Sequence, residues 1–376
     1  MKTAFLLKAM LAMFILTGVT PAAEASARWP ADRAQAWLEK TGWLAGCNYL
    51  PANAINQLEM WQADSFDPAQ IEKELAWAEQ LGFNSMRVFL HHLLWEQDPE
   101  GFLKRMDQFL AIADRHKIGA MFVLFDSCWD PFPKLGRQHE PRQGVHNSGW
   151  VQSPGAADLQ NPARHKLLEA YVKGVVGRFK DDRRVHAWDI WNEPDNTNGS
   201  SYGAQEPRNK QDLVAALLPQ AFAWARAAQP AQPLTSAPWL GPKSDPAKLH
   251  AIERVQLEQS DVLSFHNYDG LDAVKKWVAY LRPQGRPILC SEYMKRRESQ
   301  FDPILGYFKE QKVAAFNWGF VTGKSNTRFA WDTWQKPEPA AEPKLWFHDI
   351  LRADGSSFDP AEIAYIKRVN GKAGTP

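Results

Sequence analysis

The sequence predicts an α/β fold of the (β/α)8 TIM barrel type, in a single domain, from three observations. Strand-like and helix-like segments alternate along the whole chain of 376 residues, and eight of them are strand-like. The apolar residues of these strands are consecutive rather than alternating, which is typical of parallel strands buried on both faces. Eight parallel strands with intervening helices match a barrel, which uses a chain of this length.

The first 27 residues have the pattern of a secretory signal peptide. Lys2 and Lys8 give a basic start, Ala9 to Val19 form an apolar run, and Ala25-Ser26-Ala27 is a small-x-small cleavage site. The apolar run is too short to span a bilayer comfortably, which disfavours the alternative of an uncleaved membrane anchor. We therefore expect a secreted or periplasmic protein with no membrane attachment after cleavage.

The rest of the chain divides into one domain and a short tail. We expect the barrel domain at residues 28–370 and a mobile tail at residues 371–376. Removing the signal peptide takes away Lys2, Lys8 and Glu24, so the formal net charge changes from +1 to zero. A neutral chain lacks the basic field that nucleic-acid binding requires. We expect a monomer without a nucleic-acid partner.

Strands and helices can be placed from residue patterns. The clearest helix start is Asp67-Pro68, because Asp is a good N-cap residue and Pro suits the first helical position. Strands are expected at Trp43–Tyr49, Phe83–Leu90, Gly119–Phe125, Val185–Trp191, Pro233–Ala237, Val262–Tyr268, Pro287–Glu292 and Val313–Phe320. Helices are expected at Pro68–Leu81, Gly101–His116, Ala163–Phe179, Asp212–Ala228, Asp245–Glu258, Leu271–Leu281 and Phe301–Glu310.

An open doubly wound sheet is the alternative fold. Such a sheet usually carries a Gly-rich phosphate-binding loop after its first strand. The corresponding position reads Cys47-Asn48-Tyr49-Leu50-Pro51 and contains no glycine. The barrel is therefore preferred.

Two carboxylates lie at the ends of predicted strands. Asn192-Glu193-Pro194 follows the fourth strand, and Ser291-Glu292 closes the seventh. The C-terminal ends of barrel strands share one face, where active sites lie. Hydrolysis of a glycosidic bond needs two facing carboxylates, because one protonates the leaving oxygen and the other attacks the sugar carbon. The remaining strand ends are polar or aromatic as well: Asn48, Arg87, Asp126, Trp239, His266-Asn267-Tyr268 and Trp318.

The ordered set of strand-end residues resembles clan A glycoside hydrolases, and most closely glycoside hydrolase family 5, the cellulase family. The resemblance covers nearly the whole chain after the signal peptide. It implies a retaining β-glycoside hydrolase that cleaves a β-linked poly- or oligosaccharide by double displacement, without cofactor or metal. It rests on Arg87, Asn192-Glu193-Pro194, His266-x-Tyr268, Glu292 and Trp318.

The same resemblance implies a role for each residue. Glu193 resembles the general acid/base, with a pKa raised by burial and by the nearby carboxylate. Glu292 resembles the nucleophile, whose pKa Arg87 would lower. Carboxylates about 5–5.5 Å apart give retention of configuration. The substrate-binding residues implied are Asn192 at the sugar 2-hydroxyl, Tyr268 as a donor to Glu292, His266 near the acid/base, and Trp318 as the apolar floor under the reacting sugar.

One strand end departs from the family pattern. Asp126 and Trp129 stand at the strand end where family 5 often has a histidine, and both are candidates for lining the cleft. Because of this departure, the resemblance does not identify the sugar of the substrate. The loop 128–161 is long and rich in Pro, Gly and His, and loops of that length usually shape a binding site. Whether this loop closes one end of the cleft decides between endo and exo action.

Two other functions remain as alternatives. A barrel that binds carbohydrate without catalysis is compatible with 17 Trp residues, but it has no need for two facing carboxylates. A metal-dependent barrel hydrolase would carry His-x-His at an early strand end. The first strand has no such motif, and His91-His92 are adjacent residues that a strand would point to opposite faces.

The three cysteines give no sign of a zinc site. Cys47, Cys128 and Cys290 lie in or beside predicted strands and lack the spacing of zinc ligands. The odd number favours buried free thiols, although the compartment would permit one disulfide.

Overall fold

The computed structural model describes residues 27–243 and 245–372. The expected signal peptide, apart from Ala27, and the expected tail beyond residue 372 lie outside the described residues. Among the described helices, none combines the length and the apolar character that crossing a membrane requires.

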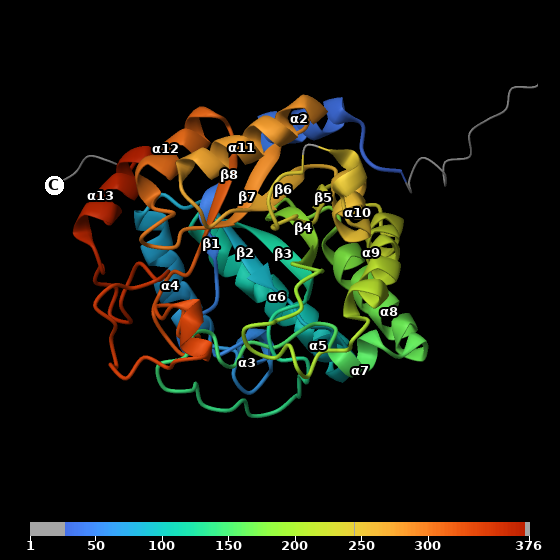
Figure 1. Cartoon of the computed structure of the whole chain (residues 1–376), viewed down its shortest axis with the longest axis horizontal. Coiled ribbons are helices and arrows are strands. Elements are labelled where there is room, and N and C mark those ends of the chain that lie inside the picture. Colours follow the sequence, from blue (N-terminus) through green and yellow to red (C-terminus); the bar gives the residue numbers. More distant parts are fainter. Residues whose placement is uncertain (1–26, 244, 373–376) are drawn as a thin grey trace, which may run out of the picture.

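Eight parallel strands form a barrel, as the sequence predicts (Figure 1). Strand β1 pairs with β2 on one side and with β8 on the other, and pairing then runs in order from β2 to β5 and from β8 to β6. Strands β5 and β6 meet through a hydrogen bond of 2.8 Å from Asp261 N to Leu234 O and a contact of 2.7 Å between the Thr235 and Ser264 hydroxyls. The strands are β1 (Ala45–Asn48), β2 (Ser85–Phe89), β3 (Gly119–Asp126), β4 (Val185–Asn192), β5 (Leu234–Thr235), β6 (Leu263–His266), β7 (Ile288–Tyr293) and β8 (Ala314–Trp318).

Helices surround the barrel (Figure 1). The seven expected helices correspond to α4 (Pro68–Gln80), α6 (Pro99–Arg115), α8 (His165–Phe179), α9 (Lys210–Ala227), α10 (Ala251–Gln259), α11 (Leu271–Leu281) and α12 (Phe301–Glu310). Further helices are α2 (Ala31–Thr41), α3 (Gln57–Trp61), α5 (His92–Gln97), α7 (Ala156–Leu159) and α13 (Pro360–Val369). Short 3-10 turns lie at Pro162–Arg164, Pro246–Lys248, Arg282–Gln284 and Trp331–Trp334.

The residues that predict helix starts place the start of α4 correctly, but α10 begins later than expected. The Asp67 carboxylate accepts hydrogen bonds from Ala69 N and Gln70 N, so it caps α4. The expected helix from Asp245 instead begins with the turn Pro246–Lys248, which Asp245 caps. Helix α10 starts only after His250, where Glu253 Oε2 accepts a hydrogen bond of 2.9 Å from His250 N.

Helix α2 closes the N-terminal end of the barrel. Trp29 and Ala34 pack with Leu44, Met121 and Phe316 in a separate apolar cluster at the strand starts. Figure 1 shows α2 at the top of the view, whereas the long loops after β3 (green) and β8 (orange to red) lie at the bottom. The C-terminal strand ends, which carry the candidate site, therefore face away from α2.

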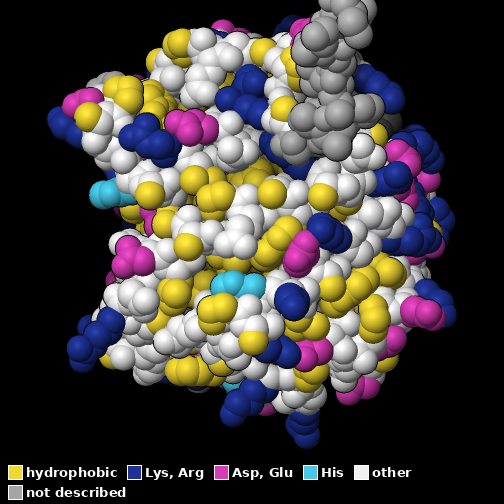
Figure 2. Space-filling model, turned by 90° about the vertical axis from the view of Figure 1, so that its right-hand side faces the viewer, with side chains coloured by type: hydrophobic (Ala, Val, Ile, Leu, Met, Phe, Trp, Pro, Cys, Tyr) yellow, Lys and Arg dark blue, Asp and Glu magenta, His cyan; other side chains and the backbone are white. Residues whose placement is uncertain are grey.

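The charged surface agrees with the balanced charge of the sequence, and the cysteines agree with their predicted state. The face in Figure 2 carries basic and acidic side chains that are interspersed rather than gathered by sign. Cys47, Cys128 and Cys290 are all buried and free, which agrees with the prediction of free thiols.

Candidate active site

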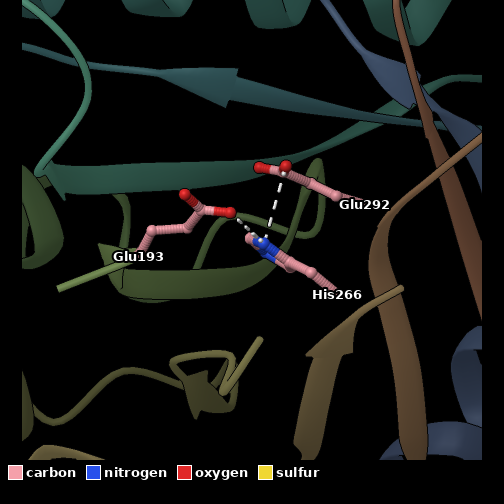
Figure 3. A group of neighbouring side chains, drawn as sticks. All are labelled: Glu193, His266 and Glu292. Atoms are coloured by element: carbon pink, nitrogen blue, oxygen red, sulfur yellow. Dashed lines mark hydrogen bonds and ion pairs between the residues drawn. The ribbon is translucent and has the colours of Figure 1, made fainter. Parts of the chain in front are cut away.

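The two predicted carboxylates meet at the C-terminal end of the barrel. Glu193 directly follows β4, and Glu292 lies in β7. Figure 3 shows them approaching from opposite sides with the His266 ring between them. An oxygen of each carboxylate and a ring nitrogen of His266 all lie within 4.8 Å of one another. This close approach fits the short separation of a retaining pair.

Glu193 is held in an unusual backbone conformation. Its φ is +42°, in the left-handed region that residues other than glycine seldom adopt. Strain of this kind often marks a functional position. Its Oε2 accepts a hydrogen bond of 2.7 Å from Asn196 Nδ2 and one of 3.4 Å from Cys128 Sγ. Burial raises the pKa of Glu193, as expected for a general acid, while these two donors act against the rise.

Glu292 is held by two strong donors. Arg87 Nη1 donates to Oε1 at 2.7 Å, and the Tyr268 hydroxyl donates to Oε2 at 2.7 Å. Burial raises the pKa of Glu292 by more than His266, Arg87 and Tyr268 together lower it, and Glu193 adds to the rise. Arg87 thus lowers the pKa of Glu292 as expected, but desolvation outweighs this effect and the net shift is upward.

Arg87 connects both sides of the site. Its guanidinium is fully buried and donates to Asp189 Oδ2 from Nε at 3.1 Å and from Nη2 at 2.7 Å. It also donates to Asn48 Oδ1 and to Asn192 Oδ1, each at 2.7 Å. Sequence reasoning missed Asp189 as the second counter-ion of Arg87. An acidic residue in the middle of an apolar strand was the signal for it.

Asp126 lies behind the cavity rather than in its wall. Its Oδ1 accepts from Asn192 Nδ2 at 2.9 Å, and its Oδ2 accepts from Trp150 Nε1 at 2.6 Å. Burial raises the pKa of Asp126 to about 7. The cavity lining includes Asn192, whereas Asp126, like Arg87 and His266, lies just behind it. Asp126 instead fixes the orientation of Asn192.

His266 is neutral and sits between the carboxylates. Its Nδ1 lies 3.1 Å from Glu193 Oε1 and 3.5 Å from Glu292 Oε2. Burial lowers the pKa of His266 to about 4. The buried Nε2 has no hydrogen-bond partner, which fits a ring that carries its proton on Nδ1 and donates it to Glu193. His266 thus lies near the acid/base as expected, although just behind the cavity wall.

A cavity of about 530 Å³ opens over the two carboxylates. This volume lies in the usual range for small-molecule sites. Of the predicted residues, Glu193, Glu292, Asn192, Tyr268, Trp318 and Trp129 line it. Sequence reasoning missed other lining residues, among them Cys128, Asp195, Asn196 and Trp331. The lining combines carboxylates and amides with aromatic rings, so the cavity suits a polar ligand with apolar faces.

The carboxylate pair with His266 is also a conceivable metal-ligand set. Two carboxylates and an imidazole suit Zn²⁺ or Fe²⁺. Both oxygens of Glu292 already accept hydrogen bonds from Arg87 and Tyr268, and the fixed charge of Arg87 opposes a second cation there. The geometry therefore favours proton transfer over metal binding.

The adjacent histidines differ from expectation in geometry. His91 precedes α5 and His92 begins it, and their rings stack with centroids 4.8 Å apart instead of pointing to opposite faces. His91 Nε2 contacts Gln152 O at 2.9 Å, and His92 Nε2 contacts Asp158 at 2.7 Å. Protein partners thus occupy these nitrogens.

Comparison with known sequences points to glycoside hydrolases. Residues 144–238 match Glycosyl hydrolase family 10, a clan A family. A "Probable mannan endo-1,4-beta-mannosidase F" of Aspergillus flavus is 27% identical over 95 residues, which cover 24% of this chain and 18% of the relative. A "Probable mannan endo-1,4-beta-mannosidase A-1" of Aspergillus terreus is 30% identical over 92 residues, or 24% of this chain and 21% of the relative. The matches thus span about a fifth of the length of these relatives.

Solved structures share the barrel. An exo-beta-1,4-mannosidase from Opitutaceae bacterium strain TAV5 aligns with a TM-score of 0.57 and 17% identity, covering 88% of this chain and 59% of that one. GH5_18 from Streptomyces cattleya, in complex with GlcNAc, has a TM-score of 0.57 and 14% identity, covering 89% and 82%. A beta-mannanase from the blue mussel Mytilus edulis has a TM-score of 0.51 and 16% identity, covering 78% and 89%. The predicted fold and the resemblance to clan A glycoside hydrolases are confirmed.

Proposed function

We propose that the chain is a retaining β-glycoside hydrolase that cleaves O-glycosidic bonds of a β-mannan or a manno-oligosaccharide. The observation that carries the proposal is the meeting of Glu193 and Glu292 in one cavity, with oxygens within 4.8 Å. A barrel that only binds carbohydrate would not need this buried pair of carboxylates, whose desolvation is unfavourable.

The reaction takes two displacements. Glu292 attacks the anomeric carbon while Glu193 donates its proton to the glycosidic oxygen, so the C–O bond breaks and a glycosyl-Glu292 ester forms. Water then attacks the same carbon, Glu193 takes its proton, and the carboxylate of Glu292 leaves. Each step inverts the anomeric centre, so the product retains the substrate's configuration.

The hydrogen-bond donors around the two carboxylates indicate which of the two is protonated. Glu292 accepts from the cation Arg87 and from Tyr268, both of which stabilise its ionised form. Glu193 accepts from an amide, a thiol and a neutral imidazole, which stabilise an ionised carboxylate less. A single proton shared by the pair therefore resides on Glu193. When Glu292 becomes esterified its charge disappears, so Glu193 loses its proton more easily and can serve as base.

The substrate class follows from the cavity lining and from the relatives. Asn192 is fixed by Arg87 and Asp126 and can hold a sugar hydroxyl beside the carboxylates. The ring of Trp318 offers an apolar surface for the C–H face of a pyranose. The curated relatives above are named as mannan endo-1,4-beta-mannosidases, which makes a β-mannoside the first substrate to test.

The setting of the enzyme is part of the proposal. The residue pattern of positions 1–27 supports a secreted or periplasmic protein, free of the membrane after cleavage. We also propose that it acts as a monomer.

Glu292→Gln and Glu193→Gln variants test the function. Both should lose at least about 100-fold in kcat on manno-oligosaccharides, because each removes a group that acts in the transition state. Glu258→Gln, which alters an exposed glutamate, is the matched control. NMR should show the β-anomer as first product, and a chelator should leave the rate unchanged. Full activity in either active-site variant would refute the proposal.

A further inference from the structure

The most exposed part of the cavity lining lies on one side. Among its described lining residues, the exposed ones all lie in the chain between β4 and β6: Thr197, Gly199, Ser200, Gln211 and Leu240. The lining residues from the loops after β3, β6 and β8, such as His146, Tyr268 and Trp331, are buried or half-buried. The opening therefore lies beside the loop that follows Glu193.

A segment of the β8 loop contributes Trp331 to the less exposed side of the lining. We call residues 329–338 the bridge segment. Its Trp334 ring stacks on the Trp129 ring of the β3 loop, with centroids 6.0 Å apart and planes at 27°. The Arg142 guanidinium lies 5.2 Å from the centroid of the same ring. The Trp331 ring meets Tyr268 after β6 edge-on, with centroids 4.9 Å apart.

Hydrogen bonds fix the bridge segment to two other loops. His146 N donates to Thr333 Oγ1 at 2.9 Å, and Glu338 N donates to Gly144 O at 2.9 Å. Gln335 Nε2 donates to Ser200 O at 2.7 Å, which connects the segment to the β4 loop. The loops after β3 and β8 lie together at the bottom of Figure 1. The β8 loop thus packs against the β3 loop and Tyr268 on the less exposed side of the cavity, and it touches the β4 loop at Ser200.

The acid/base tells which part of a substrate faces the opening. Glu193 protonates the leaving oxygen, so the leaving part of the glycan extends toward Glu193 and its loop. The sugar that forms the ester lies toward Glu292 and Tyr268, where the lining is buried or half-buried. A chain that continued beyond this sugar would meet Trp129 and Trp331, which line the cavity, and Trp334 supports the Trp129 ring by stacking on it.

From this geometry we infer that the enzyme is exo-acting, and that it removes one sugar at a time from the non-reducing end of a neutral β-linked oligosaccharide. The inference rests on the proposed function and deepens it. It departs from the endo action named for the curated relatives, and the bridge segment is the structural reason.

The test uses the whole protein and β-1,4-mannohexaose whose reducing end has been reduced with borohydride. Mass spectrometry at low conversion should show mannose and reduced mannopentaose as the first products. The viscosity of a soluble mannan should not fall during the same period. Mannobiose, mannotriose or a rapid fall in viscosity would overturn the exo inference but leave the proposed function intact. Failure to hydrolyse both mannohexaose and an aryl β-mannoside would overturn both.

Variants test whether the bridge segment sets this specificity. Trp334→Ala removes the ring that stacks on Trp129, so internal fragments of mannohexaose should rise at least several-fold relative to mannose. Gln335→Ala removes only the bond to Ser200 and should act in the same direction, more weakly, which keeps the test decisive if Trp334→Ala is unstable. Trp77→Ala, a half-buried Trp of α4, is the control and should leave the product pattern unchanged. A product pattern unaltered in both folded bridge variants contradicts a role for the bridge.

Discussion

The thiol of Cys128 lies 3.4 Å from Oε2 of Glu193. The contact joins the end of β3 to the acid/base candidate, and the thiol acts to lower the pKa of Glu193. Cys128→Ala should therefore raise that pKa, and the alkaline limb of the kcat/KM profile should move to higher pH, because the acid stays protonated longer. The pH dependence of aryl β-mannoside hydrolysis measures this shift.

Cys47→Ala serves as the control for this variant. Cys47 is equally buried but contacts Met86 rather than a carboxylate. It should lose some stability without moving the alkaline limb. An alkaline limb that stays in place in Cys128→Ala would show that the thiol merely fills space.

The Tyr268 hydroxyl should control the acidic limb. It donates to Glu292 at 2.7 Å and thereby favours the ionised nucleophile. Tyr268→Phe removes this donor, so the pKa of Glu292 should rise and activity should be lost at a higher pH on acidification. Tyr280→Phe on α11 is the control. If the acidic limb of Tyr268→Phe coincides with that of the wild type, the hydrogen bond does not set the ionisation of Glu292.

Asp189 should matter for stability as much as for the site. It is a fully buried counter-ion of the fully buried Arg87. Asp189→Asn leaves that cation undercompensated, and the free energy of unfolding should fall by about 3–5 kcal/mol. Urea denaturation measures the loss. Asp114→Asn removes the partner of the exposed Arg183 and should change it by less than about 1 kcal/mol. Equal effects of the two substitutions would contradict the prediction.

The half-buried His186 should make the fold sensitive to acid. Burial lowers the pKa of His186 from 6.5 to about 4. Between these values the unfolded chain binds a proton that the folded chain does not, so this residue removes stability as the pH falls from 6.5 to 4. The loss from His186 approaches about 3 kcal/mol at pH 4.

A His186→Gln variant should lack this contribution. Its free energy of unfolding in urea should fall less than that of the wild type between about pH 7 and about pH 4.5. The exposed His139→Gln variant controls for the removal of a histidine. A pH dependence identical to the wild type in His186→Gln would show that the residue titrates alike in both states.

The strands and the central carboxylates were predictable because their signals are local. Buried parallel strands are continuous apolar runs, so each expected strand overlaps an observed one. Glu193 and Glu292 were recognised because an acidic side chain beside a buried apolar strand is unfavourable to desolvate, which makes it a candidate for a functional role. Asp189 carried the same signal inside its strand but was not recognised.

The missed residues depend on how loops fold. Asn196 reaches Glu193 only because the chain turns back after Pro194, and Trp331 reaches Tyr268 from a distant part of the chain, beyond β8. The sign of the Glu292 shift was also out of reach, because desolvation depends on complete burial that a strand end does not reveal. Periodicity says nothing about such long-range contacts.

Helix α2 covers one end of the barrel, and the cavity lies at the opposite end. Trp29 and its neighbours fill the strand starts, so Trp29 and α2 lie on the side opposite to the cavity. Attachment to a solid support through an exposed side chain introduced on α2 should therefore leave the cavity and Leu240 accessible to polymeric substrates.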